Sequence, residues 1–193
     1  MVMAEATNHY FKHLGVSDGL SQVCIPSIYQ DELGAVWLGT TEGLNRYNGK
    51  DVKVFQPSES NHGLTNNEIN ELCGDKNGRM YIRSGNDLIK LDIYTEQFTC
   101  LRQKGVYGLF CKKDTLWVSC ADGIYYYTGQ GTELTFFARV QKGFVGRALY
   151  VDKETVWVVT RKYLVAISRE DPLRQEILLT LDKGNCILGD ISG

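Results

Sequence analysis

The sequence predicts an all-β fold, a β-propeller segment of about four four-stranded antiparallel blades. Three observations favour it. A unit of about 40 residues repeats along the chain, and that period is typical of propeller blades. The composition is rich in Gly (20 residues) and aromatics (11 Tyr, 7 Phe, 3 Trp) but holds only 3 Pro in 193 residues, which suits short strands joined by tight turns. Helical periodicity is nearly absent.

The repeat is clearest between the first two units, which superimpose after a shift of 44 residues without a gap. Gly19-Leu20-Ser21-Gln22 falls on Gly63-Leu64-Thr65-Asn66, and Asp31-x-x-Gly34 falls on Asp75-x-x-Gly78. Two weaker copies follow. One aromatic anchor recurs in each unit: Trp37, Tyr81, Trp117 and Trp157. Because the anchors recur at one place, we expect them to fill the space between adjacent blades.

The elements of a unit follow in order from its residues. An apolar strand (25–29) leads into the Asp-x-x-Gly loop, where Asp bonds nearby backbone and Gly adopts a positive φ. A second strand starts at the aromatic anchor, a third covers 44–47 and a fourth lies near 52–55. The blades are predicted at 23–55, 67–101, 106–138 and 146–181. Pro172–Leu181 is the one stretch with a helical alternative, and nothing repeats at the shorter period of a solenoid.

The two ends of the chain predict an incomplete propeller over residues 9–193, after a tail at 1–8. Ile187–Gly193 reproduces Ile28–Gly34, so 182–193 reads as the start of a fifth unit whose anchor is due at position 196. Tyr10-Phe11-Lys12-His13 matches the outermost strand of a unit that lacks its first three strands. We therefore expect exposed blade edges and self-association through them.

Charge and hydropathy exclude several classes of partner. Lys and Arg (21) nearly balance Asp and Glu (23), and the net charge is −2, which argues against nucleic-acid binding. No apolar run is long enough to cross a bilayer, so no direct membrane contact is expected, and the first residues lack the apolar stretch of a signal peptide.

The six cysteines predict no metal site. They form no C-x-x-C pair, and the sequence holds three histidines (His9, His13, His62) without cysteines at ligand spacing. The i, i+4 spacing of His9 and His13 is read as coincidence. Buried free thiols are the main interpretation, with at least one disulfide as the alternative. The cysteines are Cys24, Cys73, Cys100, Cys111, Cys120 and Cys186.

The pattern Ile28-x-x-Asp-x-x-Gly-x-x-Trp-Leu-Gly-Thr-x-x-Gly-Leu-x-x-Tyr47 resembles the two-component-regulator propeller repeat. The opening His9–Leu14, followed by Asp18-Gly-Leu-Ser21, is similar to the sensor half of hybrid two-component systems in glycan-digesting gut bacteria. The resemblance implies a periplasmic ligand sensor. In such a protein two propellers and a further β-domain lie outside, and a membrane helix leads to kinase, receiver and DNA-binding domains inside. Units three and four keep the aromatic anchor but lose the Gly before it.

An oligosaccharide is the expected ligand, and the turns between second and third strands are its predicted site, because loops on a rigid scaffold vary freely. Arg83 stands where the other units have Gly39 and Ser119. Three roles are open to Arg83: ligand contact, a structural ion pair or solvent exposure. The candidate ligand-binding residues are Glu42, Arg83, Asn86, Asp87, Asp122, Arg161 and Tyr163.

Two other function classes compete with the sensor. Propellers also host lyases and lactonases, but no catalytic motif, nucleophile elbow or phosphate loop is visible, so we predict no enzyme activity, catalytic residue or cofactor. A protein-interaction or dimerisation platform without a small ligand is the remaining alternative.

Overall fold

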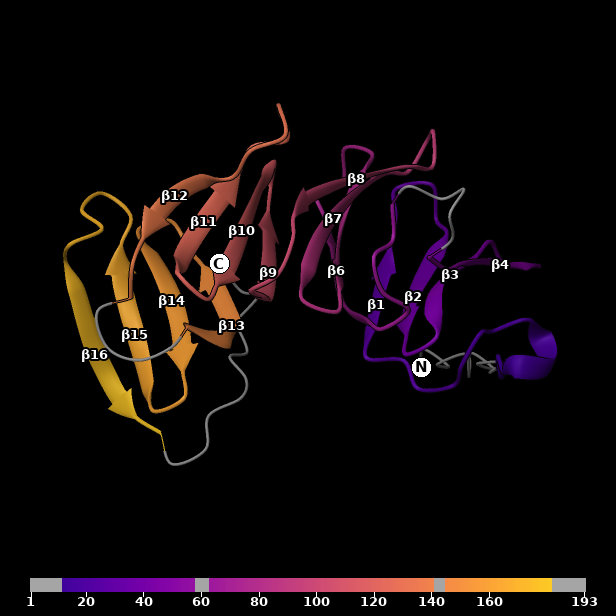
Figure 1. Ribbon diagram of the computed structural model, residues 1–193, viewed down its shortest axis with the longest axis horizontal. Coiled ribbons are helices and arrows are strands. Elements are labelled where there is room, and N and C mark those ends of the chain that lie inside the picture. The colour runs from indigo at the N-terminus through magenta and orange to yellow at the C-terminus, as the bar shows by residue number, and fades with distance from the viewer. Residues whose placement is uncertain (1–11, 58–62, 141–144, 182–193) are drawn as a thin grey trace, which may run out of the picture.

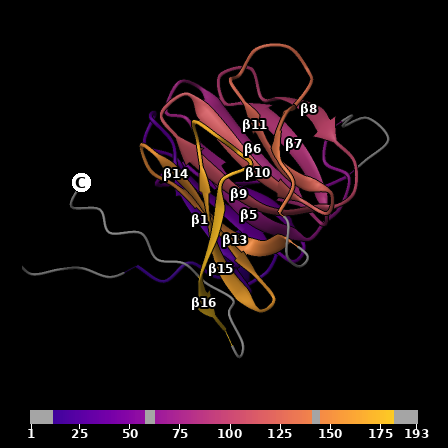
Figure 2. The same cartoon turned by 90° about the vertical axis from the view of Figure 1, so that its left-hand side faces the viewer.

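The computed structural model describes residues 12–57, 63–140 and 145–181, and these form four antiparallel four-stranded sheets. The sheets, here called blades 1 to 4, follow one another in chain order. Figure 1 shows them side by side, with blades 1 and 4 at opposite ends of an open row, and Figure 2 views this row from the end that carries blade 4. The predicted all-β fold of four four-stranded propeller blades is confirmed.

Within each blade the strands pair in chain order, from the first strand to the outermost fourth. Blade 1 contains β1 (Ser27–Gln30), β2 (Val36–Thr40), β3 (Gly43–Tyr47) and β4 (Val52–Phe55). Blade 2 contains β5 (Ile69–Gly74), β6 (Arg79–Ser84), β7 (Asp87–Asp92) and β8 (Gln97–Arg102). Blade 3 contains β9 (Val106–Lys112), β10 (Thr115–Cys120), β11 (Gly123–Tyr127) and β12 (Thr135–Ala138). Blade 4 contains β13 (Val145–Val151), β14 (Thr155–Thr160), β15 (Tyr163–Ser168) and β16 (Gln175–Thr180).

Two segments differ from the simplest reading of the sequence. The stretch with a helical alternative forms strand β16, because β15 offers it a paired edge: Val165 pairs with Ile177 and Leu164 with Leu179 across a bulge. A 3₁₀ turn, η1 (Val16–Asp18), precedes blade 1, and Gly19 ends it with a φ of 107°. The predicted leading strand at Tyr10-Phe11 and fifth unit at 182–193 lie outside the described residues.

The aromatic anchors lie at equivalent places, on the second strand of each blade. Trp37 packs with residues of blade 2, Tyr81 with residues of blade 3, and Trp117 with residues of blade 4. We call these contacts seams 1–2, 2–3 and 3–4. Trp157 points away from blade 3 and is only half-buried, since no further blade covers it in the described part of the chain. The predicted role of the anchors is confirmed in all three seams.

The Asp-x-x-Gly loops are turn formers, as predicted. One carboxylate oxygen of Asp31 accepts hydrogen bonds from the amides of Leu33 (3.0 Å) and Ala35 (2.8 Å), and the other accepts the Trp37 indole N–H at 2.8 Å. Gly34 has a φ of 85°, a conformation that glycine adopts without strain. The loop therefore orients the anchor of its own blade.

Blades 2 and 4 supply a donor for the corresponding carboxylate in two different ways. Asp152 repeats the arrangement with the Trp157 indole at 2.8 Å. In blade 2 the anchor is Tyr81, whose side chain has no N–H group, and the Arg79 guanidinium donates a hydrogen bond to Asp75 instead. The Arg at this position compensates for the missing indole.

The five described cysteines are free thiols, as predicted, but the prediction that they are buried is wrong for most of them. Only Cys120 is fully buried; Cys73, Cys100 and Cys111 are half-buried and Cys24 is exposed. Cys24 lies in the loop ahead of β1, where no strand covers it, and the three half-buried residues lie on the first or last strand of a blade. Cys186 lies outside the described residues.

Candidate ligand-binding face

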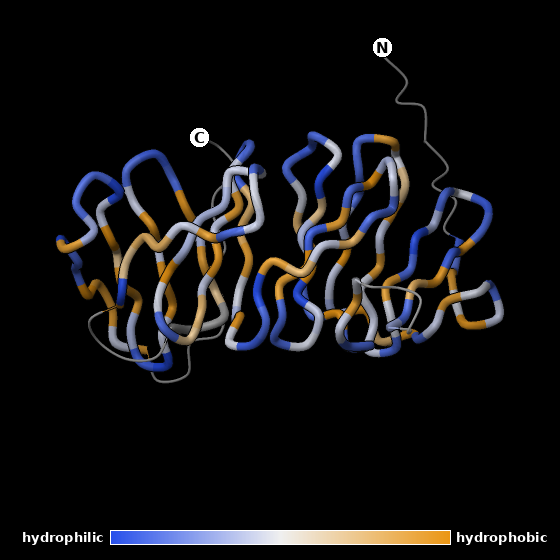
Figure 3. The backbone as a smooth tube through the Cα atoms, turned by 45° about the horizontal axis from the view of Figure 1, so that its top comes forward, coloured by the Kyte–Doolittle hydropathy of each residue, from blue (hydrophilic) through white to orange (hydrophobic). Residues whose placement is uncertain are grey.

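One rim of the row gathers the turns between second and third strands. Since all blades share one topology, these turns lie at the same end as the connections from one blade to the next. We call this rim, with turns 40–43, 84–87, 120–123 and 160–163, the turn face. Figure 3 shows hydrophilic residues concentrated in the turns at both rims and hydrophobic residues along the strands between them.

Buried hydroxyl groups fix the turns of this face. The Thr40 hydroxyl is inaccessible to solvent, donates to the Gly43 carbonyl (2.9 Å) and accepts the Glu42 amide (3.0 Å). Thr160, at the same place in blade 4, accepts the Tyr163 amide at 2.9 Å. The turns are therefore held by their own strands rather than by solvent, and the face offers a preorganised frame.

Backbone hydrogen bonds join the turn of one blade to the connection that leads into the next. The Gly43 amide donates to the Asn67 carbonyl (2.7 Å), and the Val106 amide donates to the Asn86 carbonyl (3.0 Å). The Gly-Leu-Ser motif belongs to the same scaffold: Leu20 is buried, and the Ser21 amide donates to the Asn45 side chain at 2.9 Å. The turns of blades 1 and 2 are thus each joined to the connection that follows.

All seven predicted ligand residues map to this region, but they differ in accessibility. Glu42, Asn86, Asp122 and Arg161 are exposed, one on each blade. Asp87 and Tyr163 are half-buried and serve the fold: Asp87 accepts the Lys104 amide at 2.6 Å, and Tyr163 packs against seam 3–4.

Arg83 is buried and forms the structural ion pair, one of the three roles considered for it. Its Nε lies 3.3 Å from Glu71 Oε2, and its Nη1 donates to the Gly85 carbonyl at 3.2 Å. Burial raises the pKa of Glu71, and the charge of Arg83 together with the Leu109 amide counteracts part of this shift. The pair therefore ties β5 and β6 of blade 2 to β9 of blade 3.

Charged and aromatic side chains of the face meet around Asp122. Its carboxylate accepts hydrogen bonds from Arg102 Nη2 (2.7 Å) and Tyr125 Oη (2.8 Å). The Arg102 guanidinium lies over the Tyr125 ring, 4.6 Å from its centroid, and Phe136 meets that ring edge-on at 5.4 Å. We call these four residues the Asp122 cluster.

Sequence reasoning found only Asp122 in this cluster. Arg102, Tyr125 and Phe136 belong to no sequence pattern that marks them as ligand residues. Burial alone would raise the pKa of Asp122, but the hydrogen bonds from Arg102 and Tyr125 outweigh it and lower the pKa. The Asp122 carboxylate is therefore ionised at neutral pH and lies beside the Arg102 cation. The Phe136 side chain, at the edge of the cluster, is 53% exposed.

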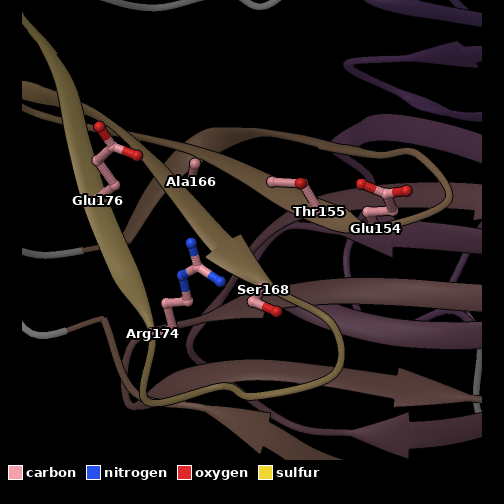
Figure 4. Close-up of a pocket in the computed structure, with 6 residues that line it drawn as sticks. All are labelled: Glu154, Thr155, Ala166, Ser168, Arg174 and Glu176. Atoms are coloured by element: carbon pink, nitrogen blue, oxygen red, sulfur yellow. The ribbon is translucent and has the colours of Figure 1, made fainter.

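A pocket of about 240 Å³ lies elsewhere, on blade 4. Glu154, Arg174 and Glu176 surround it, with Thr155, Ala166 and Ser168 (Figure 4). Ala166 pairs with both Trp157 and Glu176 across the sheet, so the pocket opens on the face that carries the half-buried anchor. It belongs to the uncovered side of blade 4, and neither Arg161 nor Tyr163 lines it.

The described residues contain no group of three or more His, Cys, Asp or Glu side chains that could hold a metal ion. His9 and His62 lie outside the described ranges. Among the described helical residues, no segment is long and apolar enough to cross a membrane.

Comparison with known proteins agrees with these observations. Residues 19–42 match the family described as "Two component regulator propeller". Residues 19–42 are therefore identified as one two-component-regulator propeller repeat. A 53-residue stretch is 40% identical to Histidine kinase P4 of Formosa agariphila, and it covers 28% of this chain and 4% of that protein.

Solved structures show the same propeller fold. The extracellular domain of a putative hybrid two-component system from B. thetaiotaomicron superimposes with a TM-score of 0.74, at 21% identity, over 90% of this chain and 27% of that domain. A gluconolactonase from Xanthomonas campestris superimposes with a TM-score of 0.60, at 12% identity, over 82% of this chain and 63% of that enzyme. At such identities the likeness shows the fold alone. This chain spans about a quarter of the length of the first domain.

Proposed function

We propose that this chain is part of the extracytoplasmic, periplasmic sensor region of a hybrid two-component histidine kinase, where its turn face contributes to ligand binding without catalysis. The observation that carries the proposal is the two-component-regulator repeat at residues 19–42 within a fold shared with the extracellular domain of such a system. Signalling by the whole protein would follow from a ligand-dependent shift between two arrangements of paired sensors.

An oligosaccharide is the ligand class that the Asp122 cluster suits best. Sugar hydroxyl groups form bidentate hydrogen bonds with carboxylate and guanidinium groups, and the apolar face of a sugar ring packs on an aromatic side chain. Asp122 and Arg102 supply the charged groups, and Phe136 supplies a half-exposed ring next to them. The exposed turn residues of the neighbouring blades, Asn86 and Arg161, extend this surface along the row.

Titration calorimetry against a panel of neutral and acidic oligosaccharides, with product analysis of each mixture, tests the proposal. We expect heat of binding and unchanged ligand. Asp122→Asn, which removes the charge beside Arg102, should weaken binding at least about tenfold, a loss of about 1.4 kcal/mol. Asp171→Asn is the matched control, because Asp171 is an exposed carboxylate in a turn of the opposite rim, and it should bind like the wild type.

Two outcomes would contradict the proposal. Conversion of a glycan would favour an enzyme, as in the gluconolactonases that share the fold. No heat of binding with any oligosaccharide of the panel would favour the protein-interaction platform. That second candidate rests on the outermost strand β16, whose apolar side chains Ile177, Leu178 and Leu179 are 39–56% exposed and offer an edge for pairing with a second chain.

A further inference from the structure

Two cysteines from different blades meet in seam 2–3. Cys73 lies on β5 and Cys111 on β9, and their Sγ atoms are 2.6 Å apart. Two unbonded sulfur atoms in ordinary contact lie much farther apart, whereas a disulfide bond measures about 2.05 Å. The fold therefore brings the two thiols into a position where bond formation needs only a small movement.

The same two positions also face each other in the preceding seam. Cys73 holds in blade 2 the place that Tyr29 holds in blade 1, opposite the aromatic anchor. Cys111 holds in blade 3 the place of Gly74 in blade 2. A Cβ atom added to Gly74 would fall 2.1 Å from the Tyr29 hydroxyl. The backbone of the repeat thus aims these side chains at one another, whatever their chemistry.

We propose that Cys73 and Cys111 form an inter-blade disulfide. Each thiol loses its proton, the S–S bond forms, and the two electrons pass to a disulfide oxidant such as oxidised glutathione, which becomes two thiols with the two protons. Both cysteines are half-buried, and burial raises the pKa of the Cys73 thiol. The bond depends only on the fold; its formation in the cell also requires the extracytoplasmic location proposed above, since that compartment is oxidising.

Seam 2–3 differs from the other two seams in its aromatic anchor. Its anchor is Tyr81 instead of a tryptophan, and the buried Tyr81 hydroxyl has no hydrogen-bond partner. The seam combines an apolar cluster with polar contacts, among them Lys90 Nζ to the Tyr127 hydroxyl at 3.3 Å. A disulfide between the first strands of both blades would fix blade 2 against blade 3.

Peptide mapping of the full chain tests the bond directly. The reduced protein is equilibrated with oxidised glutathione, free thiols are alkylated, and tryptic peptides are identified without reduction. Cleavage after Lys and Arg yields peptide 54–76 with Cys73 and peptide 105–112 with Cys111. We expect these two peptides linked, with a loss of about 2 Da from the intact chain. Alkylation of both cysteines after oxidation, or linkage of either to another cysteine or to glutathione alone, would overturn the proposal.

Matched variants separate the bond from general effects of the oxidant. Cys100→Ser changes a half-buried cysteine of the outermost strand β8 and should leave the linked peptides intact, whereas Cys111→Ser should abolish them. Oxidation should raise the Tm of the wild type and of Cys100→Ser by about 8–15 °C and leave the Tm of Cys111→Ser unchanged. An equal rise in all three proteins would contradict a stabilising bond in this seam.

Discussion

Removal of the anchor indole should destabilise the fold by an amount that depends on whether a further blade covers it. Trp37 is fully buried in seam 1–2, its ring stacks on Phe55 at 5.7 Å, and its N–H bonds to Asp31 at 2.8 Å. Loss of the ring and the cavity left behind should make Trp37→Ala about 3–5 kcal/mol less stable. Trp157 keeps the same strand position and an equivalent hydrogen bond, but its ring is half-buried, so Trp157→Ala should lose only about 1–2 kcal/mol.

Urea unfolding followed by far-UV circular dichroism measures both free energies. The difference between the two losses of unfolding free energy measures the stabilisation that burial by the neighbouring blade provides. Trp37→Phe, which retains a ring and removes the N–H bond to Asp31, provides a milder substitution with an expected loss of about 1–2 kcal/mol should Trp37→Ala fail to fold. Equal losses for Trp37→Ala and Trp157→Ala would refute the reasoning, because the seam would then contribute nothing.

Three further predictions concern electrostatics and assembly. Burial would raise the pKa of Asp152, but hydrogen bonds from the Trp157 indole and two amides outweigh it and lower the pKa. The ionised carboxylate therefore stabilises the folded state above the unfolded pKa of about 3.9, and this contribution is lost as pH falls through the lower folded pKa. Asp152→Asn should therefore have a lower free energy of unfolding than the wild type at pH 6, and it should lose less stability than the wild type between pH 4 and pH 2. Urea unfolding measures both, and the same dependence of unfolding free energy on pH in the two proteins would contradict this. Arg83→Met should lose about 2 kcal/mol of unfolding free energy at pH 7, because it leaves the half-buried Glu71 carboxylate without its cation. The loss should be smaller at low pH, because the raised pKa of Glu71 favours its neutral form there; equal losses at neutral and low pH would count against the ion pair. Sedimentation velocity should show self-association that Leu179→Lys on β16 weakens, and a monomeric wild type at all concentrations would exclude association through this edge.

The architecture could be predicted from the sequence because the spacing of the repeat aligns equivalent residues of successive blades. Each aromatic anchor recurs with the Asp-x-x-Gly loop or its counterpart, and the same spacing that aligns units one and two places Trp37 and Tyr81 in equivalent seams. Strand β16 was ambiguous because its own residues suit either structure, and the pairing with β15 decides it.

The details of the candidate site depend on neighbours that sequence spacing does not reveal. Asp122 could be placed in a turn, but Arg102 reaches it from the outermost strand of the preceding blade, and no local pattern marks that contact. Cysteine burial was predicted from strand-like apolar neighbours in the sequence, whereas the position of the strand within the blade determines it. Residue type and turn location were thus predictable, and contacts between blades were not.

Hydrogen–deuterium exchange with a pooled panel of neutral and acidic oligosaccharides tests most directly whether the turn face is the ligand-binding surface. We expect slower amide exchange in turns 84–87 and 120–123 when the glycans are present. Exchange in the opposite-rim turns at 31–35 and 152–155 should stay the same. Protection confined to the opposite rim, or none at either rim, would contradict the account.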